Sequence, residues 1–244
     1  GVASTENAGE FSSAAKGETI EDTVRVLDEY GFEAIVIRHP QTGEVAKAAA
    51  VSRTPVINAG DGKGEHPTQS LLDLYTIQRH FKRLDNLHVV IGGDLKNGRT
   101  ARSLAQMLAK YSGNRLTFVS LPGLRMGDDV KQALEHSGTR FAETDAIGNS
   151  FKDADAVYWT RLQKERMDPS DELSGGGFVI DRKALDRLPG QAIIMHPLPR
   201  VDEIADEVDS DPRAKYFEQT GNGLYIRMAL LDQIISRTGR RAKL

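Results

Sequence analysis

Short apolar runs alternate along the chain with stretches in which apolar residues recur at helical spacing. The apolar runs predict strands at 34–37, 55–58, 87–91, 116–120, 156–159 and 192–195. The helical spacing predicts helices at about 20–30, 44–52, 67–81, 100–111, 128–136 and 222–237. Strands that alternate with helices form βαβ units, so we predict an α/β fold with parallel sheets.

The alternation restarts after residue 86, and the charged segment 82–86 precedes the restart. We therefore predict two doubly wound domains, 1–82 and 83–221, followed by a terminal helix. That helix is apolar on several faces, so we expect it to be buried. The acidic, glycine-rich stretch 168–177 is expected to form a mobile loop.

The composition fits a globular chain and excludes several classes of function. The length of 244 residues suits one large or two modest domains. The net charge of −3 gives no basis for binding nucleic acid or an acidic membrane. The absence of cysteine excludes disulfides, thiolate zinc sites and a cysteine nucleophile. No apolar run is long enough to span a bilayer, and the first residues lack a signal peptide's features, so we expect a cytoplasmic protein.

A glycine-rich segment, 58–69, connects the second predicted strand to the helix that follows it. Pro67 stands where that helix begins, which places His66 and Gln69 in its first turn. Backbone N–H groups and the helix dipole favour an anion or a polar carbonyl group at such a position. The alternative is that His66 only caps the helix and the glycines form a mobile surface turn.

Other polar residues also follow predicted strands, and ligands of open α/β sheets bind beyond the carboxyl ends of the strands. They are Arg38, Asp94–Arg99, Arg161, Gln163 and His196–Arg200, with Lys16 similar in character. Arginine binds carboxylates and phosphates through two parallel hydrogen bonds, so the set indicates small ligands with more than one anionic group. For each arginine alone, the alternative is a surface salt bridge.

The remaining motifs exclude several chemistries. No nucleophile stands with a base, and no acidic or histidine residues have metal-ligand spacing. Gly92-Gly93-Asp94 does not match Gly-x-Gly-x-x-Gly, so a dinucleotide site is weakly supported. We interpret Asp202-Glu203 and Asp206-Glu207 as a solvated helix face. Catalysis by positioning and charge stabilisation is what remains.

Six motifs, spread over essentially the whole chain, resemble those of aspartate carbamoyltransferase catalytic chains. They are Lys16-Gly-Glu-Thr19, Arg38-His-Pro40, the segment 58–69, Gly93-Asp-Leu-Lys-x-Gly-Arg99, Thr160-Arg-x-Gln-Lys-Glu-Arg166 and His196-Pro-Leu-Pro-Arg-x-Asp-Glu-Ile204. The related ornithine carbamoyltransferases usually have His-Cys-Leu-Pro at 196–199. Arg161 and Gln163 also suit a second acceptor carboxylate, so the resemblance favours aspartate over ornithine.

The resemblance implies a role for each site residue. His66, Arg38 and Lys16 would be catalytic, with His66 and Arg38 polarising the carbonyl oxygen of carbamoyl phosphate. The implied carbamoyl-phosphate ligands are Arg38, His66, Gln69, Ser12, Lys16, Pro197 and Leu198. The implied aspartate ligands are Arg99, Arg161, Gln163 and Lys16. Ser12 and Lys16 match a loop that, in the family, enters the active site of a neighbouring subunit.

The implied reaction transfers the carbamoyl group to the amino group of L-aspartate, which gives N-carbamoyl-L-aspartate and phosphate in pyrimidine biosynthesis. No cofactor or metal is implied. The implied assembly is a homotrimer with shared active sites, with or without regulatory chains, and no nucleic-acid or membrane partner. The terminal helix, 222–238, would pack back on the first domain.

One family motif, the phosphate-binding Ser-Thr-Arg-Thr-Arg, lies upstream of where this sequence begins. The first domain therefore corresponds to an incomplete carbamoyl-phosphate-binding domain, and we expect a fragment in preference to a naturally shortened homologue. Three alternatives stay open at this point: a non-catalytic homologue that acts as an assembly subunit, an ornithine-type enzyme, and a generic nucleotide-binding α/β enzyme.

Overall fold

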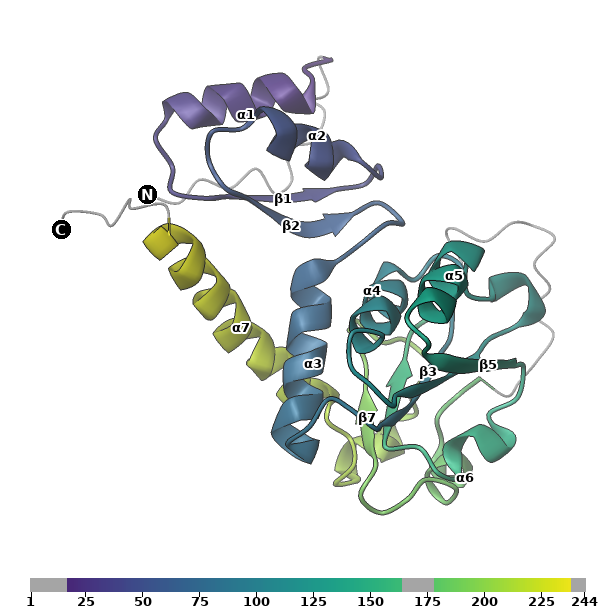
Figure 1. The fold of residues 1–244 in the computed structure, drawn as a ribbon. Helices are drawn as coiled ribbons and strands as arrows, with labels where there is room; N and C mark the ends of the chain where they lie inside the picture. Colours follow the sequence, from purple (N-terminus) through teal and green to yellow (C-terminus); the bar gives the residue numbers. More distant parts are fainter. Residues whose placement is uncertain (1–16, 164–177, 238–244) are drawn as a thin grey trace. The chain divides into compact units, whose positions relative to one another are not determined.

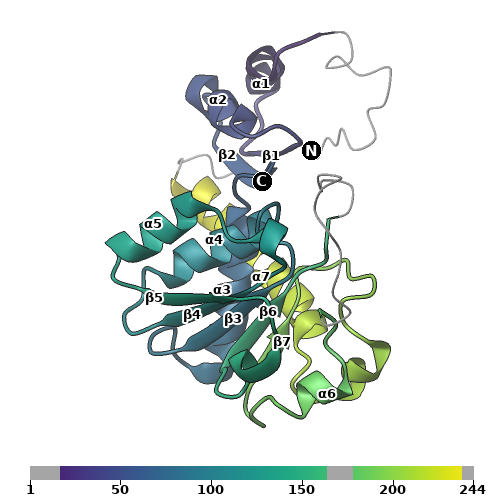
Figure 2. The same cartoon turned by 90° about the vertical axis from the view of Figure 1, so that its right-hand side faces the viewer.

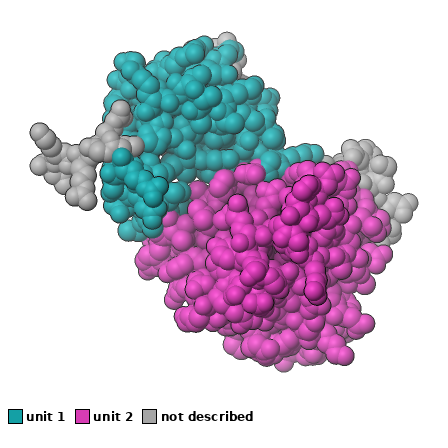
Figure 3. Space-filling model, viewed as in Figure 1, with its two compact units in different colours: residues 1–64, 227–244 teal, residues 65–226 magenta. Residues whose placement is uncertain are grey.

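The computed structural model describes residues 17–163 and 178–237 of the chain. Two compact units make up the molecule (Figures 1 and 3). The first unit comprises residues 1–64 and 227–244, and the second comprises residues 65–226. Each unit is a separate α/β body with its own parallel sheet.

The first unit is a small α/β layer. It contains α1 (Ile20–Glu29), β1 (Ile35–His39), α2 (Glu44–Val51) and β2 (Val56–Asp61). The strands pair in parallel, with Ile35 opposite Val56. Thr19 caps α1 as the sequence predicts, because its hydroxyl oxygen accepts the N–H of Asp22 at 3.1 Å. Alternate residues of β1 pack on the helices, and Val36 between them is 58% exposed.

The second unit is a five-stranded parallel sheet with helices on both faces (Figure 2). Its helices are α3 (Pro67–Phe81), α4 (Arg99–Leu108), α5 (Asp128–His136) and α6 (Arg182–Leu185), and the chain continues into α7 (Tyr216–Arg237). Its strands are β3 (His88–Gly92), β4 (Arg115–Val119), β5 (Arg140–Thr144), β6 (Ala156–Trp159) and β7 (Ile193–Met195). The strand order is β5-β4-β3-β6-β7, so the winding direction reverses between β3 and β6. Such a reversal is where open α/β sheets bind ligands.

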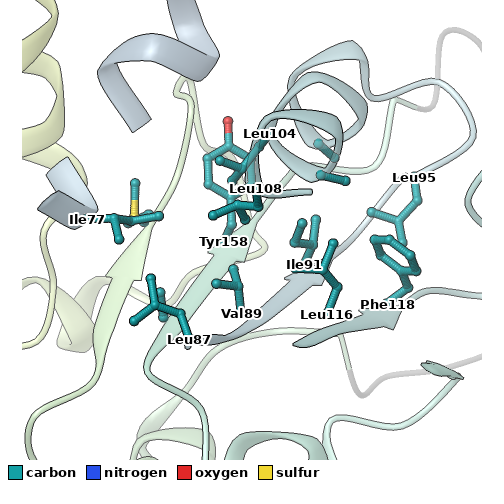
Figure 4. Packing of buried hydrophobic residues seen from close by; sticks show 14 of the residues in the cluster. Ile77, Leu87, Val89, Ile91, Leu95, Leu104, Leu108, Leu116, Phe118 and Tyr158 are labelled. Carbon is teal, nitrogen blue, oxygen red and sulfur yellow. The ribbon is translucent and has the colours of Figure 1, made fainter. Parts of the chain in front are cut away.

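Successive side chains of the central strands point to opposite faces of this sheet, and both faces are packed with apolar residues. Val89, Ile91 and Tyr158 pack under α3, α4 and α5 (Figure 4). Val90 and Trp159 point to the opposite face, which α6 and the 3-10 helix η5 (Asp206–Ser210) cover. All five residues of β3 are buried, so the near-continuous apolar run 87–91 is explained by burial on both sides.

The structure corrects three expectations about the elements. β5 is a strand that the sequence pattern does not reveal, because it lies at the sheet edge and is partly exposed along its length. α7 begins at Tyr216 and runs unbroken through Gly221 and Gly223, where the predicted helix begins only at residue 222. The expectation that this helix is buried is wrong for much of its surface, since Leu224 and Tyr225 are 60% and 61% exposed.

Candidate functional site

The loops that follow β3 and β6 meet at the switch point of the sheet. Gly93, directly after β3, has a φ of +106°, and a Cβ there would stand 2.1 Å from the carbonyl oxygen of Thr160. Only glycine fits such a backbone conformation and so close an approach. The glycine in this motif therefore has a structural reason, which is to let the β3 loop lie against the β6 loop.

A buried carboxylate joins the two loops. Asp94 is fully buried, and its Oδ1 accepts the backbone N–H of Asn97 at 2.9 Å. Its Oδ2 accepts the backbone N–H of Gln163 at 3.3 Å. Asp94 thereby holds together the loop that leads to Arg99 and the segment that carries Arg161 and Gln163. Three of the four predicted aspartate ligands, Arg99, Arg161 and Gln163, thus belong to one connected structure, and all three are half-buried.

His66 and Gln69 lie in the first turn of α3, as predicted. His66 is the N-cap residue, its backbone N–H donates to Ser103 Oγ at 3.0 Å, and its ring Nδ1 lies 3.3 Å from Thr68 Oγ1. The imidazole makes no side-chain cap hydrogen bond to the helix, so the alternative of a simple capping histidine is not supported. Gln69 is 8% exposed, and its Nε2 donates to Asp73 Oδ1 at 2.9 Å.

The glycine segment before His66 is held by hydrogen bonds, so it is not the mobile turn of the alternative interpretation. Gly62 donates its N–H to the carbonyl of His39, and Lys63 donates its N–H to Thr42 Oγ1. A Cβ on Gly62 would stand 2.4 Å from the same hydroxyl oxygen. Arg38 lies in this first unit, near the carboxyl end of β1, with its side chain exposed.

The loop after β7 carries Pro197 and Leu198 and is shaped by a buried hydrogen bond between His196 and Glu203. His196 Nε2 lies 2.7 Å from Glu203 Oε1, and both side chains are buried. His196 Nδ1 accepts the backbone N–H of Leu198 at 2.8 Å, which holds Leu198 at a φ of +48°. A positive φ is uncommon outside glycine and persists only where the surroundings enforce it. This loop backbone is therefore fixed by its neighbours.

Glu203 is a correction to the sequence interpretation, which treats it as part of a solvated face. It is 4% exposed, and its Oε2 accepts the N–H groups of Val201 and Asp202 at 3.1 Å each. Burial alone would raise the pKa of this carboxyl, but the hydrogen bonds from His196 and the backbone outweigh burial and lower the pKa below its ordinary value. Glu203 is therefore an ionised structural group.

Arg200, another member of the cationic set, is engaged in structure. Its guanidinium pairs with Asp209 and Asp206 and lies over the ring of Tyr216 at 5.5 Å. The alternative of a salt bridge therefore holds for Arg200. Ser12, Lys16 and the segment 168–177, for which the sequence predicts a mobile loop, lie outside the described residues.

The sequence analysis missed two side chains that support these ligands: Asp73 and Gln219. Asp73 is fully buried four residues after Gln69 on α3. The signal that could have revealed it is an acidic residue between two apolar ones, Leu72 and Leu74, in a helix with apolar residues at helical spacing. Gln219 carries no comparable signal, because its partner lies 146 residues away in sequence.

Two hollows in the second unit lie elsewhere. One, of about 520 Å³, is lined by residues of α3, α4 and α5, among them Ser103 and Lys110. Another, of about 640 Å³, is lined by Arg115 and Arg140 at the amino ends of β4 and β5. Neither contains a predicted ligand. Among the described residues, no group of three histidine or acidic side chains is placed to hold a metal, and no helix is long and apolar enough to cross a membrane.

The fold is that of an α/β protein with parallel sheets, and the candidate ligands of its second unit follow the carboxyl ends of strands. The family model for the aspartate/ornithine carbamoyltransferase carbamoyl-P binding domain matches residues 2–79, and the model for the Asp/Orn binding domain matches residues 85–234. The chain belongs to the aspartate/ornithine carbamoyltransferase family. The predicted family and the α/β fold class with parallel sheets are both confirmed.

Similar proteins include chloroplastic aspartate carbamoyltransferases of plants. The chain is 51% identical to that of Oryza sativa subsp. japonica over 96% of its own length and 65% of the relative's. It is also 51% identical to that of Arabidopsis thaliana, over 96% of its own length and 60% of the relative's. The chain therefore spans less than two thirds of the length of these curated relatives.

Solved structures of aspartate transcarbamoylases share the fold. The Trypanosoma cruzi protein in complex with carbamoyl phosphate is 39% identical, with a TM-score of 0.86 over 91% of this chain and 72% of that one. The catalytic subunit from M. jannaschii is 42% identical, with a TM-score of 0.85 over 95% of this chain and 76% of that one.

The expectation of a cytoplasmic protein is wrong, because the plant relatives are named chloroplastic. The physical reason is that cellular addresses are read from targeting segments. The composition of a folded enzyme domain carries no comparable signal.

Proposed function

We propose that this protein transfers the carbamoyl group of carbamoyl phosphate to the amino group of L-aspartate, giving N-carbamoyl-L-aspartate and phosphate for pyrimidine biosynthesis. The observation that carries the proposal is the attachment of both ligand-bearing loops to Asp94, at the switch point between β3 and β6. The about 50% identity to relatives named aspartate carbamoyltransferase supports the choice of acceptor.

In this proposal, the substrate ligands divide between two groups of loops. Arg99 binds the α-carboxylate of aspartate, and Arg161 and Gln163 bind its side-chain carboxylate, as arginine geometry favours. Carbamoyl phosphate is held by Arg38, His66, Gln69, Ser12 and Lys16, and by the backbone at Pro197 and Leu198. Lys16 also approaches the aspartate.

The proposed reaction is attack of the aspartate amine on the carbonyl carbon. His66 and Arg38 stabilise the oxyanion of the tetrahedral intermediate, as donors aimed at developing charge do in general. The carbon–oxygen bond to phosphate then breaks, phosphate leaves with the bonding electron pair, and the amine loses a proton. The protein's residues act by positioning and charge, with no cofactor in the scheme.

We also propose that the active form is a homotrimer with shared sites, with the functional boundary near residue 82. Residues 1–82 and helix 222–238 would then form the carbamoyl-phosphate-binding domain, and residues 83–221 the aspartate-binding domain. The family models, which end at residue 79 and begin at residue 85, support that boundary. If the boundary lies there, trypsin is expected to cleave rapidly after Lys82 and Arg83. Protection of both bonds would contradict the proposed boundary.

The test is formation of N-carbamoyl-L-aspartate by the natural full-length protein and by the 244-residue chain, with the mass in solution measured on the same samples. Arg161→Gln is expected to lower kcat/KM for aspartate by about 100-fold, since a charged hydrogen-bonding pair is lost. Arg83→Gln is the matched control, because Arg83 is a half-exposed arginine whose ion pair to Asp155 is long, at 3.7 Å.

Two outcomes would overturn the proposal. One is absence of product from the full-length protein, and the other is equal activity of the two arginine variants. A phosphonate joined to aspartate serves as a binding probe in the same samples. Tight binding without turnover would identify a non-catalytic homologue, and a faster reaction with ornithine would identify the other acceptor class.

A further inference from the structure

Asp73 occupies the centre of a buried hydrogen-bond relay in the second unit. Its Oδ1 accepts two amide N–H groups, from Gln69 Nε2 at 2.9 Å and from Gln219 Nε2 at 2.6 Å. Gln69 lies one turn earlier on α3, and Gln219 lies on α7. Asp73 is fully buried, and Gln69 and Gln219 are 8% and 1% exposed.

Each step of the relay can run in one direction only. The backbone N–H of His196 donates to Gln219 Oε1 at 3.0 Å. The other end of the amide, Gln219 Nε2, is therefore directed toward Asp73. An ionised carboxylate only accepts, so Asp73 in turn draws Gln69 Nε2 toward itself. The amide oxygen of Gln69 must then point the other way, as a hydrogen-bond acceptor.

The environment of Asp73 keeps these roles fixed. The hydroxyl of Tyr158, fully buried on β6, faces Asp73. Burial, reinforced by the negative charge of Asp73, raises the pKa of Tyr158 well above its ordinary value, so the phenol stays protonated. A buried carboxylate is costly unless donors surround it, and the amides of Gln69 and Gln219 are such donors.

We propose that Asp73 is a positioning residue that locks the side-chain amide of Gln69 in one of its two orientations, with its oxygen presented to the NH₂ group of a carbamoyl substrate. The inference rests on the proposed function for the identity of that substrate. The relay also begins at His196, whose ring fixes Leu198. The loop after β7 and the first turn of α3 are thereby set by one chain of hydrogen bonds.

Asp73→Asn tests the lock, because it keeps the shape of the side chain and replaces one carboxylate oxygen by an NH₂ group. That NH₂ group can donate to the amide oxygen of Gln69, so both orientations of the Gln69 amide become possible. We expect kcat/KM for carbamoyl phosphate to fall by about 100-fold, the cost of misplacing a substrate-orienting group. Thr76→Val is the matched control. Thr76 accepts from Asn222 Nδ2 at 2.9 Å in the same seam between α3 and α7, and it makes no contact with Gln69.

The decisive comparison is a double-mutant cycle. If Asp73 acts through Gln69, then Asp73→Asn introduced into Gln69→Ala should change kcat/KM by no more than about twofold. Full additivity of the two substitutions would overturn the proposal, as would equal losses in the Asp73→Asn and Thr76→Val variants. If Asp73→Asn acted only by disturbing the structure, kcat/KM would fall in both Asp73→Asn and Thr76→Val. The loss caused by Asp73→Asn would then also be the same with and without Gln69→Ala.

A second readout does not depend on activity. In the ¹⁵N-labelled chain, the side-chain NH₂ of Gln69 is expected to give shifted, slowly exchanging resonances, assigned by their loss in Gln69→Ala. Asp73→Asn should move them toward the values of an exposed amide, and Thr76→Val should not. Unshifted resonances would refute the lock. If the NMR result holds while no carbamoyl transfer is found, the proposed function fails and the lock stands.

Discussion

Glu203→Gln is expected to destabilise the second unit more than its conservative size suggests. Glu203 Oε1 contacts His196 Nε2 at 2.7 Å, and Glu203 Oε2 accepts two backbone N–H groups. Glutamine has one acceptor oxygen where glutamate has two. Either the imidazole or the two backbone N–H groups therefore lose their acceptor in a site from which water is excluded.

The magnitude follows from those contacts. Hydrogen bonds to a charged group contribute about 1.5–3 kcal/mol each, and three of them end on the Glu203 carboxylate. Because glutamine keeps part of the set, we expect a loss of about 3 kcal/mol at pH 7. For a protein of this size, that corresponds to a fall in Tm of about 6–12 °C.

Unfolding of the second unit can be followed by tryptophan fluorescence, because the chain has a single tryptophan. Trp159 is fully buried on β6, so its fluorescence reports unfolding of the second unit. Asp202→Asn, at the exposed neighbouring position, is the control. If Glu203→Gln and Asp202→Asn unfold within about 0.5 kcal/mol of each other, the buried pair does not stabilise the loop as described.

The same pair predicts a pH dependence. The folded-state pKa of Glu203 is lowered, so its contribution is fully present above the ordinary value of 4.5 and is lost as the pH falls through the lower folded value. The stability difference between wild type and Glu203→Gln should therefore shrink as the pH falls below about 4.5. A difference that stays constant down to pH 3 would contradict this assignment.

Three further substitutions test the site and the core. Gly93→Ala should cost about 3 kcal/mol by tryptophan fluorescence, because the added Cβ meets Thr160 in a positive-φ conformation; a cost below about 1 kcal/mol would contradict the close approach. Asp94→Asn should raise KM for aspartate by about tenfold while leaving KM for carbamoyl phosphate within about twofold, and an equal rise in both would show that Asp94 does not act on the aspartate loops. Leu104→Ala should cost about 2–5 kcal/mol in urea unfolding, since Leu104 of α4 is fully buried in the core against the sheet; a smaller loss would mean that α4 packs less tightly on the sheet.

Much of the fold could be predicted from local pattern. Central strands such as 87–91 and 156–159 are buried on both faces, so their apolar runs are unambiguous, and Gly93 after the first of them marks a close approach. Site residues at strand ends could be predicted for the same reason, because parallel strands bring their carboxyl ends to one edge. The switch between β3 and β6 then explains why the segments 94–99 and 161–163 are joined.

What the sequence could not reveal depends on partners distant in the chain. The edge strand β5 has too little burial to impose an apolar pattern. Glu203 resembles its exposed neighbours in sequence, and its buried hydrogen bond to His196 appears only in the fold. The glycines in α7 suggest a helix start at residue 222, but hydrogen bonds from Gln219 and Asn222 to α3 hold the helix together across them.

The two units have unequal continuity along the chain, and this sets an order on their formation. The second unit is one uninterrupted segment, 65–226, whereas the first unit combines residues 1–64 with residues from Arg227 onward. During synthesis from the N-terminus, the five-stranded sheet has all its residues before the first unit has its last ones. The sequence of the second unit is therefore complete before the C-terminal half of α7, which belongs to the first unit, is added.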